Sequence, residues 1–190
     1  MARQAKNSLK AGIAVWVLVG LGAFGLWNHH SAGQESWAES ARIDVLFSPN
    51  GGCTDRIVEE IGNAEKRVLV QCFYFTSKLI ADAIVAAKQR GVDCVVIADK
   101  SQEKMTYGRL PVLRSAGVKV MTDDKHATAN NKIILIDSTT IITGSLNYTK
   151  AAEERNAENM LVIKGHSDLF EKYLVNFKHH KAHSRKYKSS

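Results

Sequence analysis

The chain has 190 residues, of which 45% are hydrophobic and only two are prolines, and its formal net charge is +7. This length suits one domain of ordinary size with a hydrophobic core, so one domain is the default rather than several. The basic balance favours an anionic partner, such as nucleic acid or an anionic lipid surface, because clustered Lys and Arg side chains concentrate phosphates around them.

The N-terminal residues 1–33 have the pattern of a signal peptide or an uncleaved signal anchor. A basic stretch without acidic residues precedes the uncharged run Ala11–Trp27, whose 17 residues would span roughly 25 Å as a helix. We therefore expect an exported protein, with residues 11–27 contacting the membrane and residues 34–41 as a polar linker. The basic flank predicts a cytoplasmic N-terminus, and the rest would be periplasmic, anchored to the inner membrane or secreted. The basic residues are Arg3, Lys6 and Lys10.

After the linker, segments with strand and helix character alternate. Short apolar runs bounded by Gly, Pro or polar residues predict strands, and apolar residues spaced three or four apart predict helices. The expected strands are Ile43–Phe47, Val68–Phe75, Asp93–Ala98, Val118–Met121, Lys132–Ile136, Thr140–Thr143 and Met160–Ile163. The expected helices are Thr54–Ala64, a helix capped by Thr76 or Ser77 and ended by Gly91, Gln102–Ser115, a helical start near Tyr148–Glu154, and an amphipathic helix capped by Ser167. This alternation with apolar strands predicts an α/β fold, a mixed β-sheet sandwiched by helices on both faces.

A set of polar residues is clustered in the last third of the chain. Side chains two positions apart on a strand share a face, so Asn130 and Lys132 would present a pair to one phosphate. Lys132 supplies positive charge, and Ser145 and Asn147 supply hydrogen-bond donors that stabilise charge developing in a phosphoryl transition state. The full set is Asn130, Lys132, Asp137, Gly144-Ser145-x-Asn147 and Glu158-Asn159.

This spacing resembles the second half of the phospholipase D signature, H-x-K-x4-D followed by G-S-x-N. The chain is most similar to the single-motif Nuc-type endonucleases, and the segments Tyr74–Thr76 and Ala86–Val92 resemble them too. The resemblance covers Ile43 to Tyr187. Residues 42–190 are accordingly expected to form one phospholipase D-like catalytic domain with a basic C-terminal tail.

The resemblance implies a phosphodiesterase that works through a covalent phosphohistidine. Its substrate would be DNA or RNA, cleaved without sequence preference, or alternatively an anionic phospholipid. Glu158 stands where the family has the carboxylate that orients the histidine, and Asp137 is interpreted as a supporting residue at a turn. The route needs two histidines, and relatives with one motif form a homodimer with the active site across the interface. The resemblance implies no cofactor and no metal.

Asn130 departs from the family, because it occupies the position of the nucleophilic histidine. A carboxamide is neither nucleophilic nor able to shuttle a proton near neutral pH, so the phosphate cradle is expected to remain while covalent catalysis is lost. Two residues are weaker substitutes, His126, which only a folded-back loop would bring close, and Thr128, which lacks an evident base. The alternative function is a non-catalytic protein that binds phosphate or nucleic acid at the membrane surface.

The cysteines and the C-terminal histidines receive structural interpretations. Cys72 and Cys94 lie in apolar runs typical of buried strands, and a disulfide among these two and Cys53 is left open. The spacing of His179, His180 and His183 is compatible with a metal site. A solvated face of a basic helix is the favoured interpretation.

Overall fold

The structure is a computed structural model that describes residues 41–188. The expected signal segment, residues 1–33, and nearly all of the linker lie outside the described residues. Within the described part of the chain, no helix combines the length and the apolar character needed to cross a bilayer.

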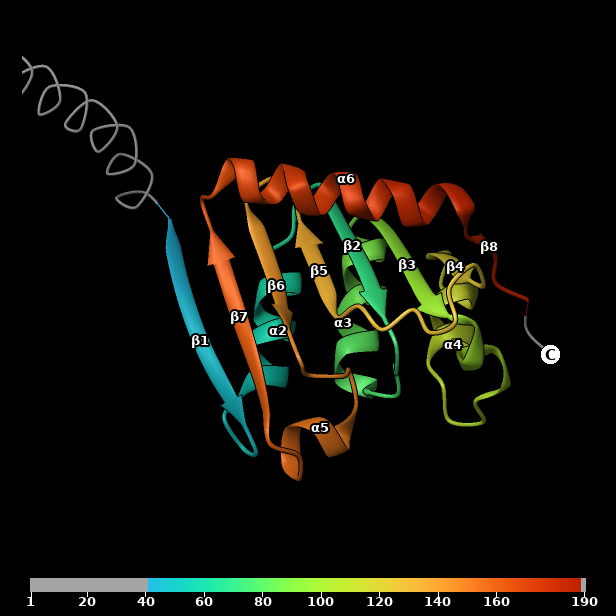
Figure 1. The fold of residues 1–190 in the computed structure, drawn as a ribbon, viewed down its shortest axis with the longest axis horizontal. Coiled ribbons are helices and arrows are strands. Elements are labelled where there is room, and N and C mark those ends of the chain that lie inside the picture. The colour runs from blue at the N-terminus through green and yellow to red at the C-terminus, as the bar shows by residue number, and fades with distance from the viewer. Residues whose placement is uncertain (1–40, 189–190) are drawn as a thin grey trace, which may run out of the picture. The chain divides into compact units, whose positions relative to one another are not determined.

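One eight-stranded mixed sheet organises the described residues (Figure 1). The strand order is β1-β7-β6-β5-β2-β3-β4-β8, in which β2, β3 and β4 run parallel and the other neighbours are antiparallel. The strands are β1 (Arg42–Ser48), β2 (Arg67–Cys72), β3 (Asp93–Asp99), β4 (Lys119–Asp123), β5 (Ile133–Ile136), β6 (Thr140–Gly144), β7 (Glu158–Lys164) and β8 (Arg185–Lys186). Every expected strand is present with ends shifted by a few residues, and β8 is an addition.

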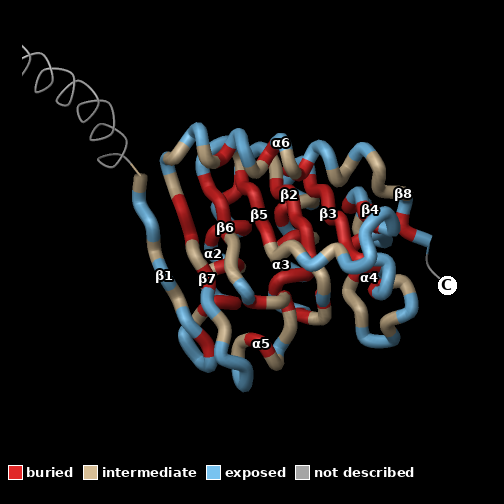
Figure 2. Tube along the Cα trace, viewed as in Figure 1, coloured by how far each residue is buried: buried red, intermediate tan, exposed pale blue. Residues whose placement is uncertain are grey.

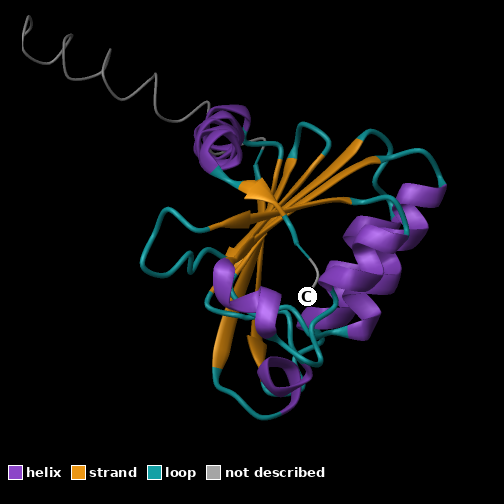
Figure 3. Ribbon diagram, turned by 90° about the vertical axis from the view of Figure 1, so that its right-hand side faces the viewer, coloured by secondary structure: helices purple, strands orange, loops and turns teal. Residues whose placement is uncertain are grey.

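Helices cover both faces of the sheet, which confirms the expected fold class (Figure 3). On one face, α2 (Cys53–Gly62), α3 (Lys78–Gln89) and α4 (Leu110–Ser115) bury apolar residues against the strands. On the other face, α6 (Ser167–His183) packs Phe170, Leu174 and Phe177 against the sheet. A short helix, α5 (Lys150–Glu154), lies between β6 and β7 in the chain.

The central strands are apolar on both sides because both of their faces are covered. In β2, Val68 and Val70 point toward α2 and α3, whereas Leu69 joins the cluster under α6. Alternate side chains of a strand point to opposite faces, so such a strand has a continuous apolar sequence. Figure 2 shows the result as a band of buried residues through β5, β2 and β3.

The expected helix Gln102–Ser115 is wrong, because two shorter elements replace it. A 3-10 helix, η1 (Lys100–Lys104), starts where the Asp99 carboxylate accepts the amide of Ser101 at 2.8 Å, and α4 begins separately at Leu110. Pro111 explains the break, since a residue without an amide proton fits the first turn of a helix far better than its interior.

The C-terminal helix corrects a second expectation, the solvated histidine face. His180 and His183 are only 12% and 19% exposed in their side chains, and both contact Asp123 at the end of β4. His179 is exposed, as expected for the outer face of the helix. Cys72 and Cys94 are buried and free, as expected for core residues, and Cys53, for which no position was predicted, is buried and free as well.

Candidate active site

Three neighbouring strands bring the motif residues together at one edge of the sheet. Lys132 immediately precedes β5, Ser145 immediately follows β6, and Glu158 is the first residue of β7. Because β5, β6 and β7 are antiparallel neighbours, the start of β5, the end of β6 and the start of β7 lie at the same edge. Residues separated by up to 26 positions in sequence (132 to 158) thus form one site.

Ser145 and Glu158 form the best-defined contact of the site. The Ser145 hydroxyl donates to Glu158 Oε2 at 2.6 Å, and its oxygen accepts the amide of Asn159 at 3.1 Å. The other carboxylate oxygen of Glu158 accepts a hydrogen bond from Asn156 Nδ2 at 3.1 Å. The carboxylate is therefore held in one orientation beside the serine.

Gly144 is required for this close approach of β6 to β7. Its φ is +155°, and a Cβ atom at this position would lie 2.2 Å from the carbonyl oxygen of Asn159. The same backbone stretch of β7 accepts the Ser145 amide at 3.1 Å. The glycine of the motif thus sets the position of the serine that follows it.

Lys132 is the positive charge of the site. Its ammonium donates to the carbonyl oxygen of Asn130 at 2.9 Å and also contacts the Asn130 side-chain oxygen. Burial lowers the pKa of Lys132, while the negative charge of Glu158 partly opposes that change. No carboxylate of the described residues lies within ion-pair distance of this ammonium, so its charge is available to an anion.

Asn147 is positioned beside the segment that follows β2. Its side-chain oxygen accepts the amide of Tyr74 at 3.4 Å. The neighbouring Tyr148 carbonyl accepts the amides of Thr76 and Ser77, both at 2.9 Å, which ties the two segments together. Lys132 approaches the same segment, with its nitrogen 5.8 Å from the centre of the Phe73 ring.

Asp137 lies at the opposite end of β5 from Lys132. Its carboxylate accepts backbone amides from Glu65 (3.2 Å), Lys66 (2.7 Å) and Arg67 (3.1 Å), just before β2. Burial alone would raise its pKa, but these hydrogen bonds and nearby Lys66 hold the pKa below the ordinary value. The structure thus gives this residue a role in joining two strands and places it at the end of β5 away from Lys132.

His126 does not take the place of the missing histidine in this structure. Its imidazole contacts the Asp123 carboxylate at 3.0 Å, and its carbonyl accepts the Lys100 ammonium at 2.8 Å. Thr128 is exposed in the same segment. The segment that leads on to Asn130 is held by Asp99, which accepts the Ala129 amide at 2.7 Å.

Comparison with known proteins places this geometry in a family. The family model described as "Cardiolipin synthase, PLD-like domain" matches residues 57–181, which run from within α2 to within α6 and contain every motif residue described above. The chain belongs to the phospholipase D superfamily. Its phospholipase D homologues are phosphodiesterase-type hydrolases.

Individual relatives support the membership over most of the chain. Proteins named phospholipase D are 33% identical over 199 aligned positions in Rickettsia felis (96% of this chain, 99% of the relative) and 37% identical over 142 in Rickettsia conorii (75% and 70%). The mitochondrial cardiolipin hydrolase of Xenopus laevis is 30% identical over 130 positions, covering 63% of this chain and 62% of that protein.

Among solved structures, Nuc from Salmonella typhimurium, a phospholipase D family member, superposes with a TM-score of 0.74. It is 30% identical, and the match covers 78% of this chain and 99% of that one. The part of this chain that has the phospholipase D-like fold thus matches nearly the whole length of Nuc. NucT from Helicobacter pylori shares the fold at 20% identity, with a TM-score of 0.71 over 77% of this chain and 99% of NucT.

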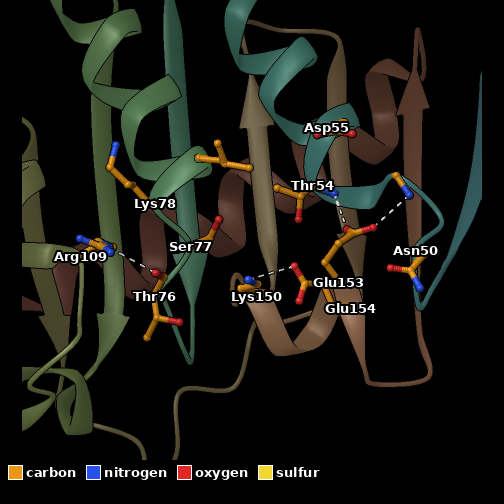
Figure 4. Close-up of a pocket in the computed structure, with 12 residues that line it drawn as sticks. Asn50, Thr54, Asp55, Thr76, Ser77, Lys78, Arg109, Lys150, Glu153 and Glu154 are labelled. Atoms are coloured by element: carbon orange, nitrogen blue, oxygen red, sulfur yellow. Dashed lines mark hydrogen bonds and ion pairs between the residues drawn. The ribbon is translucent and has the colours of Figure 1, made fainter.

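The structure also has a cavity of about 640 Å³, which no sequence pattern indicated (Figure 4). Glu153 of α5 lines this cavity. The Glu153 carboxylate accepts hydrogen bonds from the amides of Gly52 and Thr54 at 3.0 and 2.7 Å and so caps α2. None of the motif residues lines this cavity. Its lining residues are Asn50, Gly52, Thr54, Asp55, Thr76, Ser77, Lys78, Leu79, Arg109, Lys150, Glu153 and Glu154.

Proposed function

We propose that the chain is built as a sequence-nonspecific endonuclease whose cradle of Lys132, Ser145 and Asn147 holds a nucleic-acid phosphodiester. The observation that carries this proposal is the Lys132 ammonium, partly buried, without a carboxylate partner among the described residues, and next to the fixed Ser145–Glu158 pair. A cation and oriented donors in a partly dry site stabilise the charge of a phosphoryl transition state. Membership of the family and the similarity to Nuc support the proposal.

Asn130 limits turnover in this proposal, and it does not limit binding. Its carboxamide contacts the Lys132 ammonium, and this contact supports the proposal that a histidine at this position would lie beside the same cation. An amide cannot form a phosphohistidine, and it cannot protonate a leaving group. Replacing Asn130 by histidine supplies the missing group on an intact cradle.

The test compares the chain as written with Asn130→His on an activated phosphodiester in EDTA. Histidine at this position is expected to raise the rate by at least about 10²-fold, the contribution of a positioned acid-base group. Asn131→His is the matched control, since it adds the same group at the next position of the chain, and it should give no gain. Equal inertness of the Asn130→His protein and the parent, or equal gain in the control, would contradict the proposal.

The choice of nucleic acid over lipid is part of the proposal and has its own test. It is supported by the net charge of +7 and by a chain short enough to lack long insertions that could build a deep lipid pocket. The Asn130→His protein is incubated separately with single-stranded DNA, RNA and vesicles of anionic phospholipid. Faster turnover of the phospholipid headgroup bond than of either nucleic acid would reverse the substrate assignment.

A two-fold homodimer is the assembly we propose, because the chain contains one motif and the family chemistry needs two histidines. The test mixes the Asn130→His chain with an excess of the parent chain, which keeps Asn130. An active site shared across the interface predicts a lower rate per Asn130→His chain in the mixture, because each mixed dimer contains only one of the two histidines. A monomer in sedimentation under conditions of full activity would refute the assembly.

We also propose that the domain is exported, with residues 11–27 as its membrane contact. The basic residues before this apolar run support a cytoplasmic N-terminus. A reporter enzyme that is active only outside the cytoplasm, fused after residue 190, should be active with the full chain and inactive when residues 1–33 are deleted. Activity of both fusions would refute export by this segment.

The alternative is a protein that binds phosphate or nucleic acid without cleaving it, and Asn130 is the observation that favours it. It predicts salt-dependent DNA binding by the chain as written, with no turnover even in the Asn130→His protein. Lys132→Ala should then weaken binding and lower the slope of log K against log salt by about 0.9. Lys172→Ala, which removes an exposed charge of α6, is the control of equal net charge.

A further inference from the structure

Four potential metal ligands converge at the edge of the sheet where α6 ends. Asp123 is the last residue of β4, His126 follows it in the next segment, and His180 and His183 are in the last turn of α6. Their ligand atoms all lie within 4.8 Å of one another. The ring centres of the three histidines are 4.9, 5.2 and 5.2 Å apart, so the rings form a nearly equilateral triangle.

The Asp123 carboxylate is the centre of this cluster. Its side chain is only 1% exposed, and one oxygen, Oδ2, lies 3.0 Å from His126 Nδ1, 2.8 Å from His180 Nδ1 and 3.2 Å from His183 Nε2. His126 Nδ1 also lies 3.2 Å from the other oxygen, Oδ1, so all three imidazole nitrogens are within hydrogen-bond distance of this one carboxylate. Three nitrogens and one oxygen are a complete ligand set for a tetrahedral ion.

The spacing fits a divalent transition metal of the size of zinc. Bonds of about 2.0–2.1 Å in a tetrahedron place neighbouring ligand atoms roughly 3.3 Å apart. The three nitrogen-to-oxygen distances, 2.8 to 3.2 Å, are already close to this value. The widest pair of ligand atoms is at most 4.8 Å apart, so it would need to close by about 1.5 Å or less. The His126 side chain is 44% exposed, which leaves its ring room to rotate toward a bound ion.

The electrostatic surroundings also favour a cation. The C-terminal end of a helix carries partial negative charge, and two of the histidines are in that last turn of α6. Arg185, two residues after His183, is turned to other carboxylates, with contacts of 2.6 and 2.7 Å to Glu103 and 2.6 Å to Asp124. Lys125 and Lys181 adjoin His126 and His180 in sequence, and neither forms an ion pair with Asp123. Among the described residues, the only side chains in ion-pair contact with Asp123 are the three histidines.

We propose that Asp123, His126, His180 and His183 form a structural binding site for a divalent transition metal, with zinc as the preferred ion. The bound metal joins β4, the C-terminal end of α6 and the segment 124–132 that leads to Asn130 and Lys132. It would hold the helix that covers one face of the sheet and the loop that enters the phosphate cradle. None of its four ligands belongs to the cradle, so this ion is separate from the phosphodiester chemistry.

The first experiment measures zinc binding to the full chain after removal of metal with a chelator. Titration calorimetry and elemental analysis should give one zinc ion per chain. His183→Ala and His180→Ala should each weaken binding by at least about 100-fold, the upper end of what loss of a mere supporting contact costs. His179→Ala, a neighbouring exposed histidine on the same helix, is the matched control and should bind as the parent does.

A second variant separates loss of a ligand from loss of the fold. His183→Gln keeps an amide donor that can reach Asp123 but removes the imidazole ligand, so it should fold, as judged by circular dichroism, and lose zinc. Cobalt(II) bound to the parent should show the intense visible absorption of tetrahedral coordination. Absence of stoichiometric zinc, octahedral cobalt, or equal loss of binding in the His179→Ala control would each overturn the site. No substrate is present in these measurements, so they are independent of the proposed endonuclease activity.

Discussion

Replacing Asp137 by asparagine or alanine distinguishes a structural carboxylate from a catalytic one. Asparagine keeps the size of the side chain and tolerates the φ of +54° at this position, but it cannot accept all three amides that the carboxylate accepts. Alanine loses all three hydrogen bonds and also disfavours the left-handed backbone. Both variants are expected to lower stability and to leave the phosphodiester site unchanged.

The magnitude follows from these contacts. A hydrogen bond to a charged group contributes about 1.5–3 kcal/mol when buried, and these amides are partly exposed, so we take the low end. Asp137→Asn should cost about 1–2 kcal/mol of unfolding free energy. Asp137→Ala should cost more than Asp137→Asn by at least about 1–2 kcal/mol, because the left-handed conformation adds about that much for alanine and all three hydrogen bonds are lost.

The pH dependence gives an independent check. The folded-state pKa of Asp137 is below that of the unfolded chain, so the carboxylate stabilises the fold above the unfolded value of about 3.9. That contribution is lost as pH falls from there through the lower folded-state pKa. The difference in stability between parent and Asp137→Asn should therefore be constant near neutral pH and shrink in acid.

The assay is urea unfolding followed by circular dichroism, together with phosphodiester turnover of the same substitutions in the Asn130→His protein. We expect a lower unfolding midpoint and a rate within experimental error of the Asn130→His parent while the protein is folded. Loss of turnover by orders of magnitude with unchanged stability would refute the structural role and return Asp137 to the reacting centre.

Two further predictions concern residues that hold the site from outside. Gly144→Ala should destabilise the protein by more than about 1–3 kcal/mol, since its φ of +155° is strained for alanine and the new Cβ would lie 2.2 Å from the Asn159 carbonyl oxygen. Thermal unfolding measures this loss of stability. An unchanged melting temperature would show that β6 and β7 separate without cost. Glu153→Ala should lower the free energy of unfolding by about 1 kcal/mol, because it removes the cap of α2. The control Glu154→Ala, which like Glu153→Ala changes a residue of α5, should lower it less. The reverse order in urea unfolding would exclude the capping role.

Local patterns in the sequence were sufficient to predict the strands of the sheet, and the family resemblance predicted the set of site residues, whose role as a phosphate cradle stays a prediction. The strand before Asp137, β5, and the strand that ends at Gly144, β6, are adjacent partners of one hairpin. The sequence spacing of the motif therefore determines which of its residues lie close together. Lys132 and Ser145 needed only the antiparallel pairing of β5 with β6 to come close. The prediction of one helix over Gln102–Ser115 was wrong. It gave more weight to the spacing of the apolar residues than to Pro111 and Gly108, which indicate a break in the helix.

Contacts between distant segments could not be predicted in the same way. Asp123 and His183 are 60 positions apart, and only the direction of α6 across the sheet brings them together. In the sequence alone, His180 and His183 have the pattern of the solvated face of a basic helix. Glu153 likewise belongs to no local pattern, and its role depends on α5 lying against the start of α2. A contact between a carboxylate and an imidazole from distant parts of the chain produces no pattern in the local sequence around either residue.

The single helix α6 has a consequence for how the protein is made. Leu69, Val95 and Leu135 are covered by Phe170, Leu174 and Phe177, and those three residues follow strands β1 to β7 in the chain. Until α6 leaves the ribosome, one side of the sheet is uncovered and open to aggregation. The nascent protein therefore has a long vulnerable interval, and a truncation that removes most of α6 should yield insoluble material rather than a smaller domain.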